Sequence, residues 1–549
     1  MEFNLATVVE AVEAAAPDRL AVAFRERELT YAQFGDRWRR LANALVGAGL
    51  GAHIDRSELA GHQSGQDHLA IYLHNGNEYL EAMVGAFAAR VAPFNVNYRY
   101  VAEELRYLLA DARAKAIVFH SSFAPVLDEV RRDLPELTTL WQVADSSGND
   151  LLEGAQWYED ILSASNPTII DELRSSWSPD DLYMLYTGGT TGMPKGVLWR
   201  QADIFCAALG GRQLANGEEW ADLGAIVESA ATGGAKLMPT PPFMHGAAHW
   251  MAFNAFTGGN SIVLPDVVDR FDPGDVMRVV TSYGVNILLI VGDAFGKPLV
   301  AELESGRWDT SSILAVVSGG AALSAGVKQR FLELMPAAMV LDGLGASETG
   351  QQGSQVATAG ADPSTGDFTP GPGMAVLDET MTHELFAGHD GVGWLAQQGR
   401  VPLGYLGDAD KTARTFPVIN GVRHAVPGDR AQLNADGRLV LLGRDSATIN
   451  TGGEKVFSEE VEAAFAGHVA VRDVVVTGRP SERWGNEVVA VIALADGHTP
   501  TDDELLTHAA EHIARYKLPK AIVRVPVVQR SPSGKADHRW AKGIAVGDG

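Results

Sequence analysis

The chain has 549 residues, 46% of them hydrophobic, and a formal net charge of −25 at pH 7. A single hydrophobic core stops growing near ~250–300 residues, so this length predicts more than one domain. The strong negative charge argues against nucleic acid and against anionic membrane surfaces, because phosphate-rich partners need basic patches.

The cysteine content and the first residues of the sequence indicate the compartment in which we expect the protein. Cys206 is the only cysteine, which excludes an intrachain disulfide and a cysteine-based zinc site. The start Met-Glu-Phe-Asn-Leu lacks the basic and apolar regions of a secretion signal. Apolar runs such as Val285–Val291 are far shorter than the about 20 residues that span a bilayer. We therefore expect a cytoplasmic protein without a transmembrane segment.

The first part of the chain, up to about Gly443, alternates helical and strand-like stretches, as expected for α/β layers. Thr30 and Gln33 predict a capping box, followed by a helix that ends near Gly47 and Gly49. The apolar residues of that helix have helical spacing: Phe34, Trp38, Leu41 and Leu45. The polar segment 55–67 predicts a surface loop; further on we expect a helix over 103–112 and a strand over 116–119.

Residues 186–196 read Tyr-Thr-Gly-Gly-Thr-Thr-Gly-Met-Pro-Lys-Gly and follow the apolar run Leu182–Leu185. Such a loop can place backbone N–H groups, hydroxyls and one ammonium group around a polyphosphate. A Walker loop is excluded, because that motif needs Gly-Lys-Ser/Thr entering a helix. Here Pro194 precedes Lys195 and Gly196 follows it, which predicts that the lysine lies on a mobile turn. A surface turn rich in glycine and threonine is the alternative.

Several further motifs follow in order along the chain. They are Asp-Gly-Leu-Gly-Ala-Ser-Glu-Thr-Gly at 342–350, Tyr-Leu-Gly-Asp-Ala-Asp-Lys-Thr at 405–412, Pro-Gly-Asp at 427–429, Gly-Arg at 443–444, Asn-Thr-Gly-Gly-Glu-Lys at 450–455 and Ser-Pro-Ser-Gly-Lys at 531–535. A dinucleotide loop at 342–348 is discounted, because Glu348 stands where the third glycine of that motif belongs.

After Arg444 the pattern changes to a tail of about 100 residues. It predicts helices over 459–466 and 502–513 and strands over 473–477, 487–494 and 523–528. We expect a small α+β domain over 447–549, hinged near Ser446, behind a large N-terminal domain over 1–443.

Taken together, these motifs span nearly the whole chain and closely resemble those of the adenylate-forming (AMP-binding) superfamily. This family includes acyl-CoA synthetases, peptide-synthetase adenylation domains and beetle luciferases. The resemblance implies a large multi-layer N-terminal domain of α/β subdomains and a small mobile α+β C-terminal domain. It also implies ATP, Mg²⁺ and CoA: a carboxylate attacks the α-phosphate of ATP, and the acyl group of acyl-AMP passes to a thiol. Catalysis then falls to positioning and charge stabilisation, and no side-chain nucleophile is required.

The resemblance also implies a nucleotide site. The residues expected around the phosphates are Thr187, Gly188, Gly189, Thr190, Thr191, Gly192 and Lys195. Those expected beside adenine are Ser318, Gly319, Gly320, Ala321, Asp342, Gly343, Leu344, Gly345 and Ser347. Leu344 departs from the family, which usually places an aromatic residue there. Asp429 is expected to accept hydrogen bonds from the ribose, and Arg444 to reach the ribose or a phosphate.

Four residues are expected to carry catalysis: Lys535 as the adenylation lysine, Glu348 as the Mg²⁺ ligand, Thr191, and His245 where the acyl and CoA tunnels meet. Gly452 and Gly453 match the segment that lines the pantetheine channel. The alternatives are a solvated acid, a solvated lysine and a hydrogen-bonded core histidine. Trp250, Phe253 and Phe256 either line the acyl pocket or pack in a core.

The amino-acid sequences of four segments are similar to those of bacterial ligases that act on steroid side-chain carboxylates and long-chain fatty acids. These segments are 195–200, 342–348, 449–455 and 538–542. The expected function is therefore an ATP-dependent acyl-CoA ligase for a bulky hydrophobic carboxylic acid. Three alternatives stay open: an acyl-AMP ligase that serves a carrier protein, a luciferase-like oxygenase that shares the first half-reaction, and a catalytically silent nucleotide-binding protein. The oligomeric state is also open, with a homo-oligomer among the options.

Overall fold

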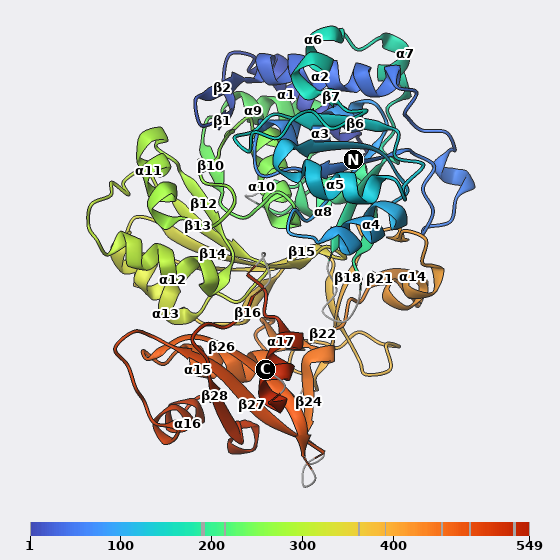
Figure 1. The fold of residues 1–549 in the computed structure, drawn as a ribbon. Helices are drawn as coiled ribbons and strands as arrows, with labels where there is room; N and C mark the ends of the chain where they lie inside the picture. The colour runs from blue at the N-terminus through green and yellow to red at the C-terminus, as the bar shows by residue number, and fades with distance from the viewer. Residues whose placement is uncertain are drawn as a thin grey trace.

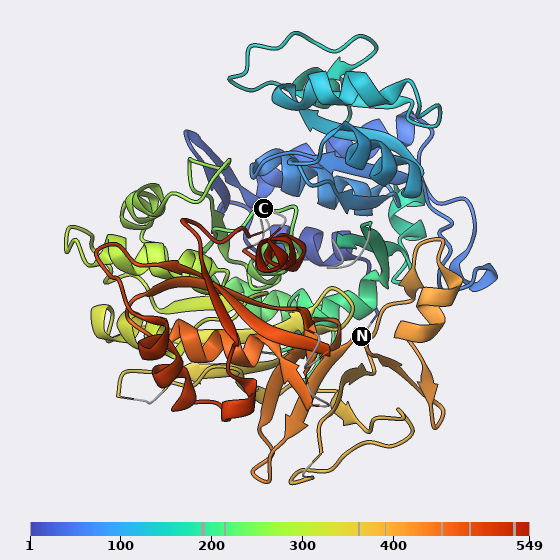
Figure 2. The same cartoon turned by 60° about the horizontal axis from the view of Figure 1, so that its bottom comes forward.

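A computed structural model describes residues 2–187, 193–213, 216–360, 363–389, 391–451, 454–481, 485–530 and 534–547. We call the part up to Arg444 the body and the part from Thr448 the C-terminal unit. Figures 1 and 2 both show the C-terminal unit, in red and dark orange, as a separate layer applied to the body.

The first sheet of the body is parallel throughout. Its strands run in the order β4 (Ala92–Asn95), β3 (His68–Tyr72), β5 (Ala114–His120), β6 (Thr139–Val143) and β7 (Gln156–Trp157). One face, with Ala70 and Tyr72, packs on α4 (Ala102–Asp111) and α5 (Ala124–Arg131). The other face, with Leu69 and Ile71, packs on α1 (Leu5–Ala15), α2 (Tyr31–Gly47) and α3 (Asn77–Ala88).

Helix α2 confirms the expected start and face. The Thr30 side chain accepts a hydrogen bond from the Gln33 N–H, and the Gln33 side chain accepts one from the Thr30 N–H. The side chains of Phe34, Trp38 and Leu41 are fully buried. The helix and strand expected at 103–112 and 116–119 are also present, as α4 and β5.

The second sheet of the body is long and central. Its path is β2 (Arg27–Thr30), β1 (Leu20–Phe24), β11 (Ser261–Val263), β10 (Lys236–Pro239), β12 (Ile287–Ile290), β13 (Ala315–Gly319), β14 (Met339–Ala346), β15 (Gly350–Ala357), β16 (Asp367–Pro370), β23 (Leu439–Arg444), β22 (Asp429–Leu433), β18 (Gly393–Gln398), β21 (Val422–Ala425) and β20 (Val418–Ile419), with β17 (Met374–Leu377) beside β18. Pairing is parallel from β1 to β14 and antiparallel from β14 onward.

Helices cover both faces of the parallel part. Helices α11 (Pro273–Tyr283), α12 (Gly292–Leu303) and α13 (Ala325–Leu334) pack on the face with Leu288 and Val316. Helices α9 (Leu223–Ala231) and α10 (Gly246–Thr257) pack on the opposite face with Leu237 and Leu289. In α10, Phe253 and Phe256 are core residues, since their rings contact each other and those of Phe87 and Phe34.

A third, antiparallel sheet contains β8 (Leu182–Thr187), β9 (Lys195–Arg200) and β19 (Gly404–Tyr405). Helices α8 (Gln201–Ala208) and α14 (Ala409–Thr415) follow β9 and β19, while α6 (Tyr158–Ala164) and α7 (Asp171–Ser176) precede β8. Lys195 is the first residue of β9 and pairs with Thr187. The expectation that Lys195 lies on a mobile turn is therefore wrong: the turn ends one residue earlier, at Pro194, and antiparallel pairing fixes the lysine backbone.

The C-terminal unit has a sheet in the order β25 (Glu454–Phe457), β24 (Thr448–Thr451), β27 (Gly485–Leu494) and β26 (Val471–Ser481), with β28 (Ala521–Arg524) beside β27. Helices α15 (Ser458–Ala466) and α16 (Asp502–Ala510) cover one face, and α17 (His538–Val546) covers the other. The last strand lies earlier than the predicted 523–528, because Pro526 has no N–H to donate to a ladder. The boundaries at 443 and 447 stay a prediction.

Among the described residues, contacts from α12 and β23 help to join the C-terminal unit to the body. The ammonium group of Lys297 in α12 donates to the Arg472 carbonyl at 2.9 Å and to the Val471 carbonyl at 3.4 Å. Gly443 has φ +110, and a Cβ there would lie 2.3 Å from a carboxylate oxygen of Glu459, so only glycine lets α15 come this close to β23. Within the described ranges, no helix has the length and apolar character needed to cross a membrane.

Candidate active site

The hairpin β8–β9 carries the two ends of the predicted phosphate loop. Thr187 and Lys195 face each other across its last rung, and Gly188, Gly189, Thr190, Thr191 and Gly192 lie outside the described residues. The Lys195 ammonium nitrogen lies 3.8 Å from a carboxylate oxygen of Asp111 and 3.8 Å from one of Asp408. Burial opposes the charge, but these acids outweigh it and raise the pKa of Lys195, so the lysine is protonated.

The predicted adenine side is formed by the ends of two adjacent parallel strands, β13 and β14. Ser318 pairs with Asp342 and Gly319 with Gly343. The Ser318 hydroxyl accepts a hydrogen bond from the Gly292 N–H at 3.1 Å, which ties this edge to the start of α12. Residues 318–321 and 342–345, which sequence reasoning selected separately, therefore lie side by side. Leu344 also packs against the apolar cluster around Leu395.

Asp342 has a partner that sequence reasoning missed. The Lys328 ammonium nitrogen, from α13, lies 2.8 Å from an Asp342 carboxylate oxygen, and both side chains are almost completely buried. Lys328 also donates to the Gln355 side chain and, at 2.9 Å, to the Ser364 carbonyl. Burial raises the pKa of Asp342, while Lys328 opposes that rise. A lysine in an amphipathic helix usually faces solvent, so no local signal marks Lys328.

Glu348 lies in the turn after β14, and hydrogen bonds hold this turn in place. One carboxylate oxygen accepts a hydrogen bond from the Tyr405 hydroxyl at 2.8 Å. The Trp199 indole N–H donates to the Ser347 carbonyl at 2.8 Å, and the Thr349 hydroxyl accepts from the Ala346 N–H at 3.0 Å. The half-buried carboxylate of Glu348 is thus held in one place.

Asp429 and Arg444 are direct cross-strand partners on β22 and β23. The Arg444 guanidinium lies 2.8 Å from an Asp429 carboxylate oxygen. Burial raises the pKa of Asp429, with Arg444 opposing the rise and Glu348 adding to it. Burial would lower the pKa of Arg444, but Asp429 and Glu348 reverse that effect and raise it.

Lys535 reaches this group of charges from the C-terminal unit. Burial and the positive charge of Arg444 lower its pKa, whereas Glu348 and Asp429 oppose that change. The Lys535 side chain is exposed to solvent, although nearby protein atoms are numerous enough for burial to lower its pKa. Gly534, directly before it, has φ +77 and packs on Val291 and Ala294 of the body. Lys535, Glu348, Asp429 and Arg444 therefore meet at one site.

His245 is the N-cap of α10 and differs from the nearby His249. Its Nε2 is buried and has no hydrogen-bond partner among the described residues. Burial, then the charge of Lys535, lowers the pKa of His245 to about 3, so the imidazole is neutral. His249, in contrast, is a core histidine with a partner at each ring nitrogen. Its Nδ1 lies 3.0 Å from the Tyr183 hydroxyl and its Nε2 lies 3.3 Å from the Tyr79 hydroxyl. Gly452 and Gly453 fall outside the described residues.

Two family models match most of the chain. A family model described as AMP-binding enzyme matches residues 9–406, and one described as AMP-binding enzyme C-terminal domain matches residues 460–535. The chain belongs to the AMP-binding enzyme family. The superfamily resemblance of the motifs is thereby confirmed, and the protein is an ATP-using, adenylate-forming enzyme.

Two relatives cover nearly all of this AMP-binding enzyme. It is 56% identical to the medium-chain acyl-CoA ligase Mig of Mycobacterium avium, over 99% of this chain and 98% of that protein. It is 39% identical to the 3-oxocholest-4-en-26-oate–CoA ligase of Rhodococcus rhodochrous, over 99% of this chain and 96% of that protein. Among solved structures, the anthranilate CoA ligase AuaEII bound to anthranoyl-AMP matches with a TM-score of 0.82 at 20% identity, over 100% of this chain and 98% of that chain. That likeness confirms the fold class.

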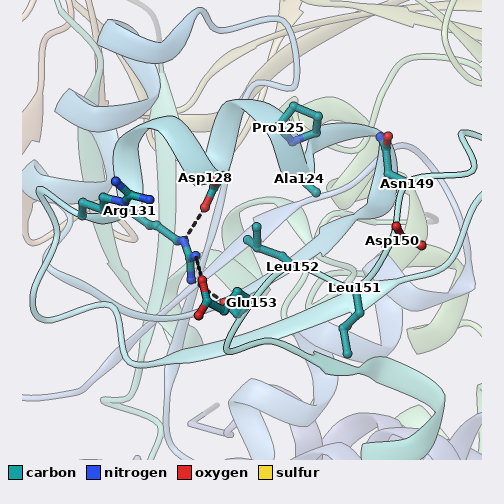
Figure 3. Close-up of a pocket in the computed structure, with 10 residues that line it drawn as sticks. Ala124, Pro125, Asp128, Arg131, Asn149, Asp150, Leu151, Leu152 and Glu153 are labelled. Atoms are coloured by element: carbon teal, nitrogen blue, oxygen red, sulfur yellow. Dashed lines mark hydrogen bonds and ion pairs between the residues drawn. The ribbon is translucent and has the colours of Figure 1, made fainter.

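Two cavities of this AMP-binding enzyme differ in their distance from the proposed site. One, of about 280 Å³, lies beside α5 between Asp128, Arg131 and the loop 149–153, and contains none of the proposed site residues (Figure 3). The other, of about 180 Å³, lies between the body and the C-terminal unit and is rimmed by Arg99, Arg270 and Arg530. It also touches Gly534, so it opens beside Lys535.

Proposed function

We propose that this enzyme is an ATP-dependent acid–CoA ligase for a bulky hydrophobic carboxylic acid, with medium-chain fatty acids as the favoured substrates and steroid side-chain acids as the next class. The names of the two full-length relatives support this choice of substrates. The observation that carries the proposal is the meeting of Lys535 with Glu348, Asp429 and Arg444, which joins the C-terminal unit to the body around one polar site.

In the first half-reaction, a substrate carboxylate oxygen attacks the α-phosphorus of ATP. The bond from this phosphorus to the bridging oxygen breaks, and acyl-AMP and pyrophosphate form. Lys535 supplies a positive charge to the reacting carboxylate and phosphate oxygens. Lys195 exchanges Asp111 and Asp408 for the outer phosphates, and the Asp429 carboxylate accepts hydrogen bonds from the ribose hydroxyls.

Glu348 is the residue proposed to hold Mg²⁺. The fit is good, because the carboxylate is half-buried, held by Tyr405, and offers the hard oxygen that this ion prefers. When bound, the ion neutralises phosphate charge. Tyr405 keeps the carboxylate in a fixed position, so little reorganisation is needed when the nucleotide enters.

In the second half-reaction, the CoA thiol gives its proton to solvent, its sulfur attacks the acyl carbonyl carbon, the bond to AMP breaks, and a thioester and AMP form. Lys535 is not needed for this step, so we propose that the C-terminal unit rotates about residues 445–447 between the two half-reactions. The arginine-rimmed cavity suits the phosphates of CoA, because guanidinium groups bind phosphate with paired hydrogen bonds. The neutral His245 imidazole is suited to orient the thiol.

Pyrophosphate release tests the proposal. The assay uses ATP, Mg²⁺ and a panel of acids from acetate through octanoate and palmitate to steroid side-chain and aryl acids, with and without CoA. Sustained turnover only with CoA and a medium-chain or steroid acid supports the ligase. Release that stalls near one equivalent with CoA present would instead indicate a carrier-protein acceptor, and ATP binding without any release would indicate a silent nucleotide-binding protein.

A further inference from the structure

Three side chains that can bind metal ions meet on the C-terminal unit, away from the proposed active site. His508, Glu511 and His512 each offer one ligand atom, and these atoms lie within 4.8 Å of one another. The residues have i, i+3 and i+4 spacing, which places them on one helical face. Helical hydrogen bonds continue beyond the end of α16: the His508 carbonyl accepts from the Glu511 N–H at 3.1 Å, and the Ala509 carbonyl accepts from the His512 N–H at 3.0 Å.

The surroundings of His508 give a second, independent observation. Its Nε2 is buried and has no hydrogen-bond partner among the described residues, which is costly for a polar atom. Gly467 lies beside this nitrogen, and even a single Cβ there would come within 3.4 Å of it. The missing side chain at Gly467 therefore leaves room around the His508 ring.

One further imidazole, that of His468, lies beside the cluster. The His468 ring lies edge-on to His508 with centroids 5.1 Å apart, and the His512 ring lies 5.0 Å from His508 on centroids. The Nδ1 of His468 accepts a hydrogen bond from the Ala470 N–H at 3.1 Å, so this ring is already engaged and we do not count it as a ligand.

We propose that His508, Glu511 and His512 form a binding site for a divalent transition metal ion that favours imidazole, with Zn²⁺ as the type ion. Two imidazoles and one carboxylate are a common ligand set for this ion and leave a fourth position for water. Mg²⁺ and Ca²⁺ are excluded from this site because both prefer oxygen ligands.

The position of the site determines what the ion does. Figure 1 shows α16 on the side of the C-terminal unit that points away from the body, whereas Lys535 faces the body. A bound ion therefore joins the last turn of α16 to the residues that follow it without touching the catalytic groups. Its effect is to stabilise the C-terminal unit, since a ligand that binds only the folded state raises its stability by mass action.

Calorimetric titration of the full-length chain with Zn²⁺, without nucleotide, tests the proposal. We expect one ion per chain and a thermal unfolding midpoint that rises with Zn²⁺ concentration. His512→Ala and His508→Ala should each weaken binding by at least about tenfold, because even outer-shell changes cost ~10–100-fold in metal affinity. The control is His498→Ala, which removes an exposed histidine of the same unit and should leave binding unchanged.

Two results would overturn the site. One is the absence of Zn²⁺ binding up to millimolar concentration; the other is binding that both histidine variants leave unchanged. Since His512 is exposed, its variant is expected to keep the wild-type unfolding midpoint in EDTA, and this measurement separates loss of the ion from loss of the fold. Zn²⁺ binding does not depend on the proposed ligase activity, so the two proposals fail separately.

Discussion

Lys195 and Lys535 are the two lysines of the proposed site, and their environments differ. Lys195 has Asp111 and Asp408 as partners, which raise its pKa. Burial and Arg444 lower the pKa of Lys535, although two acids lie close to it. One lysine is thus prepared to exchange partners with an incoming phosphate, and the other carries a charge that an anionic substrate would stabilise.

We expect Lys535→Ala to slow acyl-AMP formation by about 10²–10³-fold or more, since losing one preorganised donor costs ~2.7–4 kcal/mol. Thioester formation from supplied acyl-AMP should be nearly unchanged. Single-turnover measurements of each half-reaction separate the two effects. If both half-reactions slow equally, the role assigned to Lys535 is wrong.

The lowered pKa of Lys535 also predicts a pH effect. Adenylation needs the protonated amine, so kcat/KM for ATP should fall on the alkaline side at a pH below 10.5, the ordinary value for lysine. The arginine of Lys535→Arg keeps its charge at high pH, so this variant should shift the alkaline limb to higher pH. Its maximal kcat/KM should be lower than that of the wild type. An identical limb in both proteins would show that another group titrates.

The role of a site residue could be predicted where the residue belongs to a short motif. Its contacts could not be predicted where its partners are distant in the sequence. Glu348 and Asp429 could be selected from their motifs, and they lie close enough for the charge of Glu348 to raise the pKa of Asp429. Tyr405 belongs to a recognised motif, but its hydrogen bond to Glu348 crosses 57 positions of sequence. Phe253 and Phe256 could not be assigned to pocket or core, because both environments demand apolar side chains.

At the scale of elements, the ion pair between α13 and β14 supports the proposed adenine edge. Lys328 and Asp342 are nearly inaccessible to solvent, and Gln355 and Ser364 satisfy further protons of the ammonium group. A buried pair that is fully hydrogen-bonded holds its two elements in one relative position. Removing one partner leaves an uncompensated buried charge.

We therefore expect Lys328→Met to destabilise the body by about 3–5 kcal/mol. Denaturant unfolding followed by tryptophan fluorescence measures the loss. The double variant Lys328→Met with Asp342→Asn should recover part of the stability, because it removes the stranded carboxylate. A single variant as stable as the wild type would contradict this account of the pair.

The elements themselves were largely predictable from local patterns. Helix α2, helix α4 and the two long strands of the C-terminal unit lie where periodicity placed them, within a few residues. The position of Lys195 in a strand could not be predicted, because it depends on strand pairing that a Gly/Pro-rich loop does not reveal. The last strand was placed too late, because valine content outweighed Pro526 in the sequence pattern.

At the scale of the whole molecule, the C-terminal unit meets the body at a small number of specific contacts. Lys297 of α12 donates to the backbone of β26, and Gly534 lies against Val291 and Ala294. Such contacts fix the orientation in which Lys535 faces the nucleotide residues. The order of the motifs predicted two units, but no local pattern could give their relative orientation.

Lys297→Ala should reduce the population of this orientation. Hydrogen bonds from a half-exposed charge are worth on the order of 1 kcal/mol, so we expect acyl-AMP formation to slow by up to about tenfold. Thioester formation from supplied acyl-AMP should not slow. Lys520→Ala, at an exposed position of the C-terminal unit, is the matched control. Equal slowing in both variants would point to a general loss of stability.

The cross-strand pair of Asp429 and Arg444 has a consequence for the order of product release. The turn Asp445–Ala447, about which rotation is proposed, begins at the residue after Arg444. Rotation there carries Lys535 away but leaves both residues of the pair in the body. The proposed ribose contacts therefore persist through both half-reactions, whereas pyrophosphate is no longer bonded to the nucleotide that these contacts hold. We expect pyrophosphate to leave before CoA reacts and AMP to leave afterwards, so that AMP competes with ATP for the same form of the enzyme.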